Sequence, residues 1–338
     1  MRAFVITAPH HGEVQEVADP VAAAGQVVVE VDRAGVCGTD VELFTGEMAY
    51  LREGSARLPL RPGHEWCGTV REVAADVDPS WLGRRVTGDT MLGCGHCVRC
   101  RAGRHHVCAE RFEIGIRGGF AGALAERIAV PASALLLLPD AVDDVAGAMV
   151  EPGGNAVRCV QAAQVGPGDP LLVIGTGTIG LLVAAFGRAA GARVHLLAYD
   201  DAAVGHARSL GFPEVTTGAD LPVAPWAAVV DATNAAEVPA QALDLVEPGG
   251  RVVYIGISEA ASLIDSRDLV FRDITAVGVL AASAGLPGAA AAYADGSVDP
   301  RPLVGATIGL DGVAEVLAGH RPPGAGPGPK IHVDPRPL

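Results

Sequence analysis

The sequence predicts an α/β protein of two domains, in which a doubly wound parallel-sheet domain is inserted into a β-rich domain. Before residue 140, short apolar runs separated by Gly- and Pro-rich turns are typical of strands. From about residue 141 to 282, apolar strands alternate with helical segments, which indicates a parallel sheet covered by helices on both faces. The alternation then stops. We therefore expect residues 1–152 and 283–338 to form the β-rich domain and residues 153–282 the inserted one.

The apolar patterns place the expected elements along the chain. In the β-rich part, strands are expected at Gln26–Val31, Gly68–Val73 and Ala125–Val130. In the inserted domain, the expected strands are Pro170–Ile174, Arg193–Ala198, Ala227–Asp231, Arg251–Ile255 and Thr275–Val279. The expected helical segments between them are Leu181–Ala190, Ala202–Leu210 and Val238–Val246.

Composition and charge narrow the class of partner. The chain has 338 residues, of which 49% are hydrophobic and 19% charged, enough apolar material for two cores. The formal net charge of −14 disfavours nucleic acid and anionic membranes, which attract basic faces. The N-terminal apolar run is too short for a signal peptide, and glycines interrupt the longest apolar run, residues 171–186. We expect a cytoplasmic protein that acts on a small molecule.

A glycine-rich segment follows the first expected strand of the inserted domain. Residues 175–180 read G-T-G-T-I-G between an apolar strand and an apolar helix. Its glycines permit a tight turn and a close backbone approach, while the helix N-terminus offers N–H groups to a pyrophosphate. The alternative is a loop that only packs the sheet. The context favours a dinucleotide site, and its expected residues are Gly175, Gly177, Thr178, Ile179 and Gly180.

Four of the seven cysteines form a cluster with metal-binding spacing. Cys94, Cys97, Cys100 and Cys108 follow the pattern C-x2-C-x2-C-x7-C. A compact loop with this spacing can surround a tetrahedral ion with thiolates, which predicts a structural zinc lobe at about residues 90–110. The nearby histidines 96, 105 and 106 are expected in solvent because four thiolates fill the coordination sphere. A nucleic-acid-binding zinc ribbon would use similar spacing, but the acidic composition argues against it.

A second set of candidate ligands is spread over three segments. Cys37 lies in CGTD, His64 and Glu65 lie in GHE, and Glu151 stands where the α/β pattern begins. A thiolate, an imidazole and a carboxylate leave a fourth zinc position open, as catalytic zinc requires. Each residue alone has a structural explanation, as a buried thiol, a hydrogen-bonded histidine or a glutamate at a helix N-terminus. Spacing alone does not establish this site.

In combination, these motifs resemble the zinc-containing medium-chain alcohol dehydrogenases. The resemblance rests on CGTD, GHEWCGTV, the four-cysteine lobe, the G-x-G-x-x-G segment and the closing GLDGVAE, which occur in the family's order. It implies a Rossmann cofactor domain inserted in a GroES-like catalytic domain, two zinc ions per chain and a nicotinamide cofactor. A homodimer or a homotetramer is also usual in the family.

The resemblance also implies a role for individual residues. Cys37, His64 and Glu151 correspond to catalytic zinc ligands, and Glu65 corresponds to a carboxylate that binds the metal directly or through water. Thr39 matches the hydroxyl that relays the substrate proton. Glutamate at 151 is similar to the polyol, sugar and threonine dehydrogenase branch. The four clustered cysteines would hold the structural zinc.

Two positions depart from the family pattern. Glu42 replaces the histidine that ends the proton relay in many relatives, and it is either a terminal base, a partner for substrate hydroxyls or a solvated side chain. Ala198 stands where an NAD enzyme places its ribose-binding acid, and Asp200 is the nearest replacement. Because the acidic residues 200–201 would repel a 2′-phosphate, we expect NAD as the cofactor, with NADP as the alternative.

The expected activity is hydride transfer between a secondary alcohol and NAD(P), which gives the ketone. The substrate class is polyol, cyclitol, aminocyclitol or sugar-like. The enzymatic alternative is a threonine-like amino-alcohol dehydrogenase, for which Arg117 is the candidate partner of the substrate carboxylate. A non-catalytic cofactor-binding relative is a third hypothesis, but every expected zinc ligand is present.

Overall fold

The computed structural model describes residues 1–258 and 260–336, and the chain divides into two compact units. Unit 1 contains Met1–Glu151, Ala289–Asp295 and Asp299–Leu338, and unit 2 contains Pro152–Gly288 and Gly296–Val298. Unit 1 is thus built from both sides of the long unit 2 segment in the sequence. None of the helices in the described residues has both the length and the apolar character that crossing a membrane requires.

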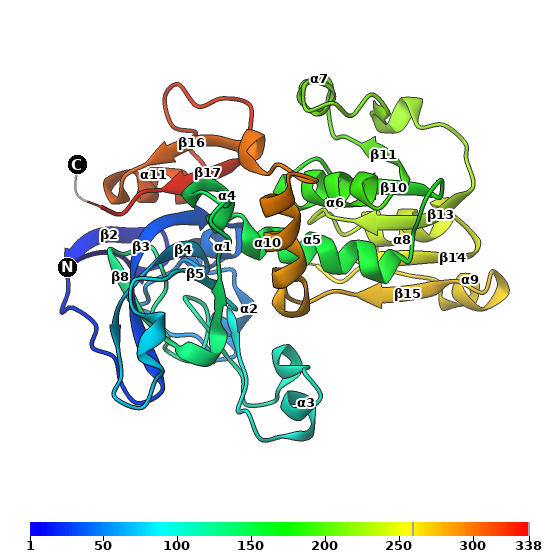
Figure 1. Ribbon diagram of the computed structural model, residues 1–338. Helices are drawn as coiled ribbons and strands as arrows, with labels where there is room; N and C mark the ends of the chain where they lie inside the picture. Colours follow the sequence, from blue (N-terminus) through cyan, green and yellow to red (C-terminus); the bar gives the residue numbers. More distant parts are fainter. Residues whose placement is uncertain (259, 337–338) are drawn as a thin grey trace. The chain divides into compact units, whose positions relative to one another are not determined.

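A seven-stranded sheet forms the frame of unit 1 (Figure 1). Its strands run in the order β16-β17-β3-β4-β5-β9, and β8 also pairs with β3. The pair β16–β17 is parallel, whereas β17–β3, β3–β4, β3–β8, β4–β5 and β5–β9 are antiparallel. The bounds are β3 Gln26–Val36, β4 Glu65–Val73, β5 Arg85–Gly88, β8 Arg127–Pro131, β9 Leu135–Leu137, β16 Val304–Ile308 and β17 Lys330–Val333.

Shorter elements complete unit 1 around an apolar core. The hairpin is β1 Arg2–Ala8 with β2 His11–Glu16, and a second pair is β6 Met91–Leu92 with β7 Phe112–Glu113. The helices are α1 Gly38–Thr45, α2 Ala49–Arg52, α3 Val98–Arg101, α4 Asp144–Ala148 and α11 Val313–Leu317. Helices α5 Val150–Ala163 and α10 Leu286–Asp295 contain the points where the chain passes between units. The core buries Phe4, Trp66 and Ile128 almost completely.

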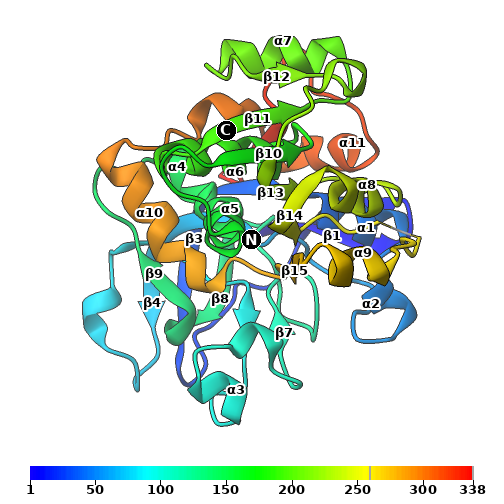
Figure 2. The ribbon, with the colours of Figure 1, turned by 90° about the vertical axis from the view of Figure 1, so that its right-hand side faces the viewer.

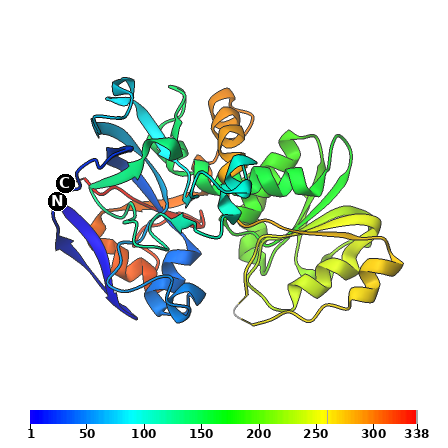
Figure 3. The same ribbon diagram turned by 90° about the horizontal axis from the view of Figure 1, so that it is seen from below.

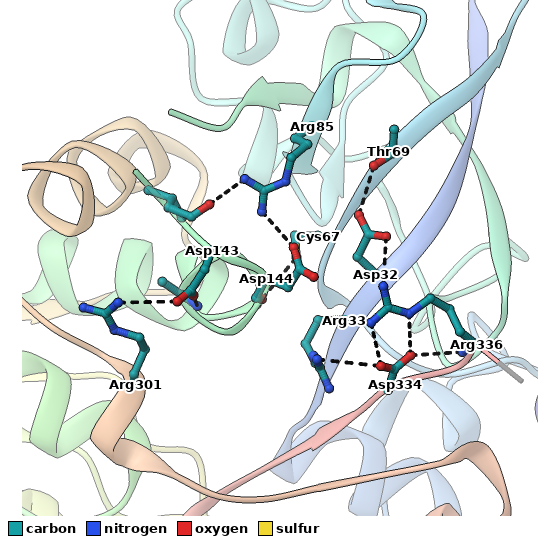
Figure 4. A network of polar contacts seen from close by, with 12 residues as sticks. Asp32, Arg33, Cys67, Thr69, Arg85, Asp143, Asp144, Arg301, Asp334 and Arg336 are labelled. Carbon is teal, nitrogen blue, oxygen red and sulfur yellow. Dashed lines mark hydrogen bonds and ion pairs between the residues drawn. The ribbon is translucent and has the colours of Figure 1, made fainter. Parts of the chain in front are cut away.

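A network of charged side chains fixes α4 and the C-terminal segment on this sheet (Figure 4). Arg85 of β5 pairs with Asp144 of α4 at 2.8 Å, and the buried Cys67 thiol donates to the Asp144 carbonyl. Farther along, Arg336 forms ion pairs with Asp334 at 2.6 Å and with Asp32 of β3 at 3.7 Å. The segment that leads into Glu151 and the segment that follows β17 are therefore both tied to the central strands.

Unit 2 is a doubly wound parallel sheet. Its six strands run in the order β12-β11-β10-β13-β14-β15, which Figure 2 shows as successive arrows. The bounds are β10 Pro170–Ile174, β11 Arg193–Leu197, β12 Val215–Thr216, β13 Trp226–Asp231, β14 Val246–Tyr254 and β15 Thr275–Gly278. The further helices are α6 Thr178–Ala189, α7 Asp201–Ser209, α8 Val238–Leu245 and α9 Ser266–Phe271. In Figure 3, green helices lie on one face of this sheet and yellow to gold helices on the other.

The predicted fold class is confirmed, and most expected elements of unit 2 end within one or two residues of the observed ones. Strand β10 has the expected bounds, whereas β14 begins five residues early. That extension arises because Val246 pairs with Trp226 before an irregularity in the register. In unit 1, β3 extends beyond the expected Val31 to Val36, and β4 begins at Glu65 before the expected Gly68. Both extensions lead directly into candidate site residues.

Candidate zinc and cofactor sites

Cys37 lies at the junction between β3 and α1, where it is the residue that caps the helix N-terminus. Its backbone N–H donates to Asp40 Oδ2 at 2.9 Å, three residues later. This is half of the reciprocal bonding that a capping box makes, in which an acidic side chain returns to the cap N–H. The turn therefore fixes the position of the half-buried Cys37 thiol.

Asp40 also holds the segment that carries His64. Its Oδ1 accepts from the backbone N–H of Gly63 at 3.0 Å and lies 3.7 Å from His64 Nδ1. Both side chains are buried. Burial lowers the pKa of His64, but Asp40 and the Cys37 thiol outweigh burial, so that this pKa is raised well above its ordinary value. Asp40 thus contacts the imidazole and connects two of the three segments that carry the candidate ligands.

Cys37, His64 and Glu65 form one cluster of possible metal ligands. Their sulfur, nitrogen and oxygen atoms all lie within 4.8 Å of one another. Thiolate, imidazole and carboxylate are the donor types of zinc sites. This donor set fits a zinc ion.

Glu65 is at the same time the partner of a buried ammonium. Lys330 Nζ of β17 donates to both Glu65 oxygens, at 2.7 and 2.6 Å, and to the carbonyl of Val36 at 2.9 Å. Glu65 and Lys330 are 1% and 4% exposed. Burial alone would lower the pKa of Lys330, but the negative groups around it raise the pKa overall. Gly35 makes room for this pair, because a Cβ there would overlap Glu65 Oε2.

The other predicted residues of this site lie on two helices, Thr39 and Glu42 on α1 and Glu151 on α5. Glu151 is buried in the first turn of α5, outside the group of three whose ligand atoms lie within 4.8 Å. Thr39 and Glu42 are half-buried on α1, three residues apart. Residues with this spacing face the same side of a helix. The structure thus brings Cys37, His64 and Glu65 together and leaves Thr39 and Glu42 adjacent on one helix that begins at Cys37.

The four-cysteine lobe has the geometry of a closed zinc site. All four sulfurs lie within 4.8 Å of one another, with Cys94 and Cys100 3.9 Å apart and Cys97 and Cys108 3.8 Å apart. Zinc–sulfur bonds of about 2.3 Å place two sulfurs of a tetrahedron about 3.8 Å apart. The lobe fits a zinc ion with four thiolates.

Hydrogen bonds from the backbone prepare two of these thiols for deprotonation. The backbone N–H of Cys100 donates to the Cys97 sulfur at 3.4 Å and lowers the Cys97 pKa. The pKa of Cys108 is lowered to about 6, first through a backbone hydrogen bond from Cys94. Burial instead raises the pKa of Cys100 to about 12. A bound divalent cation deprotonates such a thiol outright.

The histidines beside this lobe differ in their surroundings. His96 is exposed and His105 is partly buried, with its Nε2 2.6 Å from Asp89. His106 is buried, so its expected exposure to solvent is wrong. The short turn 105–107 folds its side chain inward, which no spacing rule indicates.

The glycine-rich loop between β10 and α6 has the backbone of a phosphate-binding turn. Gly175 has a φ of 105°, which favours glycine, and Gly177 is the N-cap of α6. A Cβ at Gly180 would overlap the Gly175 carbonyl. Thr178 and Ile179 open the helix, where N–H groups lack intrahelical partners. These features fit the pyrophosphate of a dinucleotide.

Asp200 follows the next strand and caps α7. Its Oδ1 accepts from the Ala203 backbone N–H at 2.8 Å, and the residue is exposed. Ala198 is buried. The acid two residues beyond the strand is therefore accessible, with one oxygen engaged in the helix cap.

Two residues of the zinc site were not identified from the sequence. Asp40 was part of the CGTD motif without a role, although an acid three residues after a helix cap signals a capping box. Lys330 is the only lysine of the chain and lies 265 residues from its partner Glu65. The one feature of the sequence that could have drawn attention to Lys330 is that it is the only lysine among many arginines.

The fold and the two ligand sets define a zinc-binding oxidoreductase with a nucleotide-binding domain. Residues 23–140 match the alcohol dehydrogenase GroES-like domain, and residues 178–294 match the zinc-binding dehydrogenase family. Together these matches span more than half of the chain. The chain belongs to the zinc-containing medium-chain alcohol dehydrogenases, and it is an NAD(P)-dependent dehydrogenase.

Individual relatives agree with this assignment. The chain is 33% identical over 291 residues to an L-threonine 3-dehydrogenase of Saccharopolyspora erythraea, covering 82% of this chain and 83% of the relative. It is 27% identical to a structure described as a zinc-binding dehydrogenase from Sinorhizobium meliloti 1021 bound to NADP, with a TM-score of 0.89 and 99% of each chain covered. A 2R,3R-butanediol dehydrogenase from Bacillus subtilis, 24% identical over 99% of each chain with a TM-score of 0.86, shares the fold.

Proposed function

We propose that this enzyme oxidises a secondary hydroxyl of a polyol, cyclitol, aminocyclitol or sugar-like substrate to the ketone, or catalyses the reverse reduction. The observation that carries this proposal is the cluster of the half-buried Cys37 with the buried His64 and Glu65, at the end of β3 and the start of β4. Polar side chains on α1 next to that cluster suit a substrate with several hydroxyls. A bound zinc would act as a Lewis acid on the substrate oxygen, and the nicotinamide would accept the hydride.

The proposed zinc ligands are Cys37, His64 and Glu151. Glu65 is the fourth candidate ligand, but both of its oxygens accept hydrogen bonds from Lys330. We assign Glu65 to the second layer around the ligands, where its charge is neutralised by the ammonium. Asp40 orients His64 through the 3.7 Å contact at Nδ1, as carboxylates beside metal-binding histidines do. The four cysteines of the lobe hold the structural zinc.

Proton transfer is assigned to α1. The Thr39 hydroxyl accepts the proton of the substrate hydroxyl, since it can donate and accept at the same oxygen. Glu42, three residues later on the same helix, is the terminal base or binds a further substrate hydroxyl. In either role of Glu42, the polar side chains of Thr39 and Glu42 lie on the helix that begins at Cys37.

The substrate class is tested by following cofactor reduction with polyols, cyclitols, aminocyclitols and L-threonine under matched conditions. We expect the highest kcat/KM with a polyol or cyclitol. The relatives named L-threonine 3-dehydrogenase make an amino-alcohol substrate the second candidate. A higher kcat/KM with L-threonine would replace the first proposal by the second. In that case Arg117, whose guanidinium lies 5.1 Å from the Tyr50 ring centre, is the first side chain to test as the carboxylate partner.

NAD is the proposed cofactor, bound at Gly175, Gly177, Thr178, Ile179 and Gly180, with Asp200 toward the ribose. The exposed acids 200 and 201 would repel a 2′-phosphate, so NADH should bind at least about tenfold more tightly than NADPH, a difference of about 1.4 kcal/mol. Fluorescence titration with both cofactors measures this ratio. Asp200→Asn keeps a helix cap of similar quality and removes the charge, so the ratio should fall in this variant. Tighter NADPH binding by the wild type would contradict the assignment.

We also propose that the enzyme acts in the cytoplasm as a homodimer or homotetramer. The four clustered thiols need a reducing compartment to stay available for metal. Strand β15 is an edge of the unit 2 sheet, and Val270, Phe271 and Leu280 near it are exposed. An open strand edge beside apolar side chains favours pairing with a second copy.

Phe271→Glu should weaken this assembly. Phe271 is 83% exposed at the end of α9, and a charge there would be desolvated in an interface. Light scattering after gel filtration should show a smaller mass for this variant than for the wild type. Val223→Glu is the matched control, because Val223 is also an exposed apolar residue of unit 2 but lies before β13. An unchanged mass for Phe271→Glu would exclude α9 from the interface.

A further inference from the structure

Unit 1 contains a pocket whose lining does not include the zinc ligands. Its volume is about 680 Å³, and it lies between the β1–β2 hairpin, the loop at residues 54–61 and the loop at residues 118–121. Val5, Leu60 and Phe120 contribute apolar wall. Neither the cluster of Cys37, His64 and Glu65 nor the α1 residues Thr39 and Glu42 line this space. The pocket is therefore a cavity with its own chemistry.

Two arginines give the pocket its charge. Arg57 and Arg61 both line it, and its lining contains no aspartate or glutamate. This is unexpected in a chain with 39 acidic and 25 basic residues. Elsewhere in unit 1, arginines find acidic partners, such as Asp311 for Arg2 and Glu30 for Arg71. The pocket is thus locally positive on an acidic protein.

Neither guanidinium has a partner within the described part of the chain. No hydrogen bond, ion pair or ring contact engages the side chain of Arg57 or Arg61. Arg61 is half-buried, and burial lowers its pKa. Arginine nevertheless keeps its charge in proteins, and burying a charge without a partner is costly. Arg57 is exposed, whereas the half-buried Arg61 lines a cavity whose lining carries no counter-charge. Such a position favours an anion from outside the chain.

We propose that this pocket binds a small organic molecule through its phosphate or carboxylate group, held by Arg57 and Arg61. Guanidinium groups present parallel N–H donors that match the oxygens of either anion. The apolar wall at Val5, Leu60 and Phe120 would contact the remainder of the ligand. The segment that carries Arg61 continues through Gly63 to His64, so an occupant touches the chain three residues before a proposed zinc ligand.

Isothermal titration of the zinc-loaded, full-length enzyme with inorganic phosphate, and separately with acetate, tests the proposal. The phosphate arm and the acetate arm distinguish the two kinds of anion. Arg61→Gln should weaken the binding of whichever anion binds by at least about tenfold, because it removes hydrogen bonds made by a charged group. Arg57→Gln should also weaken the binding of that anion. Arg61→Lys keeps the charge and should retain part of the affinity.

Arg84→Gln is the matched control. Arg84 is an exposed arginine of unit 1 that does not line the pocket, so its loss changes the net charge equally and should leave the affinity unchanged. Circular dichroism confirms that each variant is folded. Saturable binding that falls in the pocket variants but not in Arg84→Gln supports the site. Absence of saturation by either anion below about 10 mM, or equal affinity in all variants, overturns it.

Discussion

Cys37→Ser should abolish turnover and lower the zinc content from two ions per chain to one. The serine hydroxyl does not supply a thiolate, and second-layer partners alone change metal affinity by about 10–100-fold, so loss of a ligand should exceed that range. The turn at Asp40 uses the backbone N–H of residue 37 and therefore survives the substitution. Metal analysis and steady-state kinetics on the same preparation measure both effects.

Cys159→Ser provides the control for this experiment. Cys159 is a buried thiol of unit 2, and burial raises its pKa to about 12, which suits a packing role. This variant should keep both zinc ions and its activity, even if it is somewhat less stable. Retained activity in Cys37→Ser would refute the assignment of Cys37 as a ligand. Loss of both zinc ions in Cys37→Ser would point to unfolding and not to a lost ligand, which circular dichroism would show.

Lys330→Met should lower the free energy of unfolding by about 3–5 kcal/mol, because it leaves the buried Glu65 carboxylate without its counter-charge. The ammonium donates to both carboxylate oxygens, and neither residue has more than 4% exposure to solvent. Methionine has a similar length and fills the space, so the effect reports the charge. Denaturant unfolding of the zinc-loaded protein gives the difference.

Two further variants make this result specific. Arg71→Met breaks the exposed pair with Glu30 and should cost less than about 1 kcal/mol. The double variant Lys330→Met with Glu65→Leu removes both charges and should recover much of the lost stability, since an apolar replacement of a buried pair is often neutral. If Lys330→Met lowers the free energy of unfolding no more than Arg71→Met does, the ion pair of Lys330 with Glu65 does not stabilise the fold in the way proposed.

The sequence was most informative where local rules act. The segment 170–180 predicted a strand, a glycine turn and a helix, because each glycine there meets a backbone requirement that can be read from spacing. The cluster of four cysteines could also be predicted from the sequence, since one short loop carries all four candidate ligands. The extension of β4 back to Glu65 was not predicted, because the apolar pattern there is that of a strand buried on both faces and has no alternation.

Contacts between segments that are distant in the sequence could not be predicted from sequence patterns. Asp40 and Gly63 are 23 residues apart, and their hydrogen bond depends on how α1 and β4 meet. The pairing of Glu65 with Lys330 depends on the register of β17 against β3, which sets Ile331 opposite Val36. No periodicity specifies that register across the whole of unit 2. Tertiary contacts, not local propensity, determine which side chains share the zinc site.

The late position of β17 has a consequence for synthesis of the protein. Its partner strand β3 leaves the ribosome about 300 residues earlier, so the catalytic sheet stays open at that edge while the whole of unit 2 is translated. Unit 2 is nearly continuous in sequence and can fold as it emerges, whereas unit 1 must wait for its last strand. Glu65 lacks its counter-charge until then. The candidate zinc site would therefore be complete only at the end of translation, and a nascent chain that stops before Lys330 would carry Cys37, His64 and Glu65 without the strand that completes their surroundings.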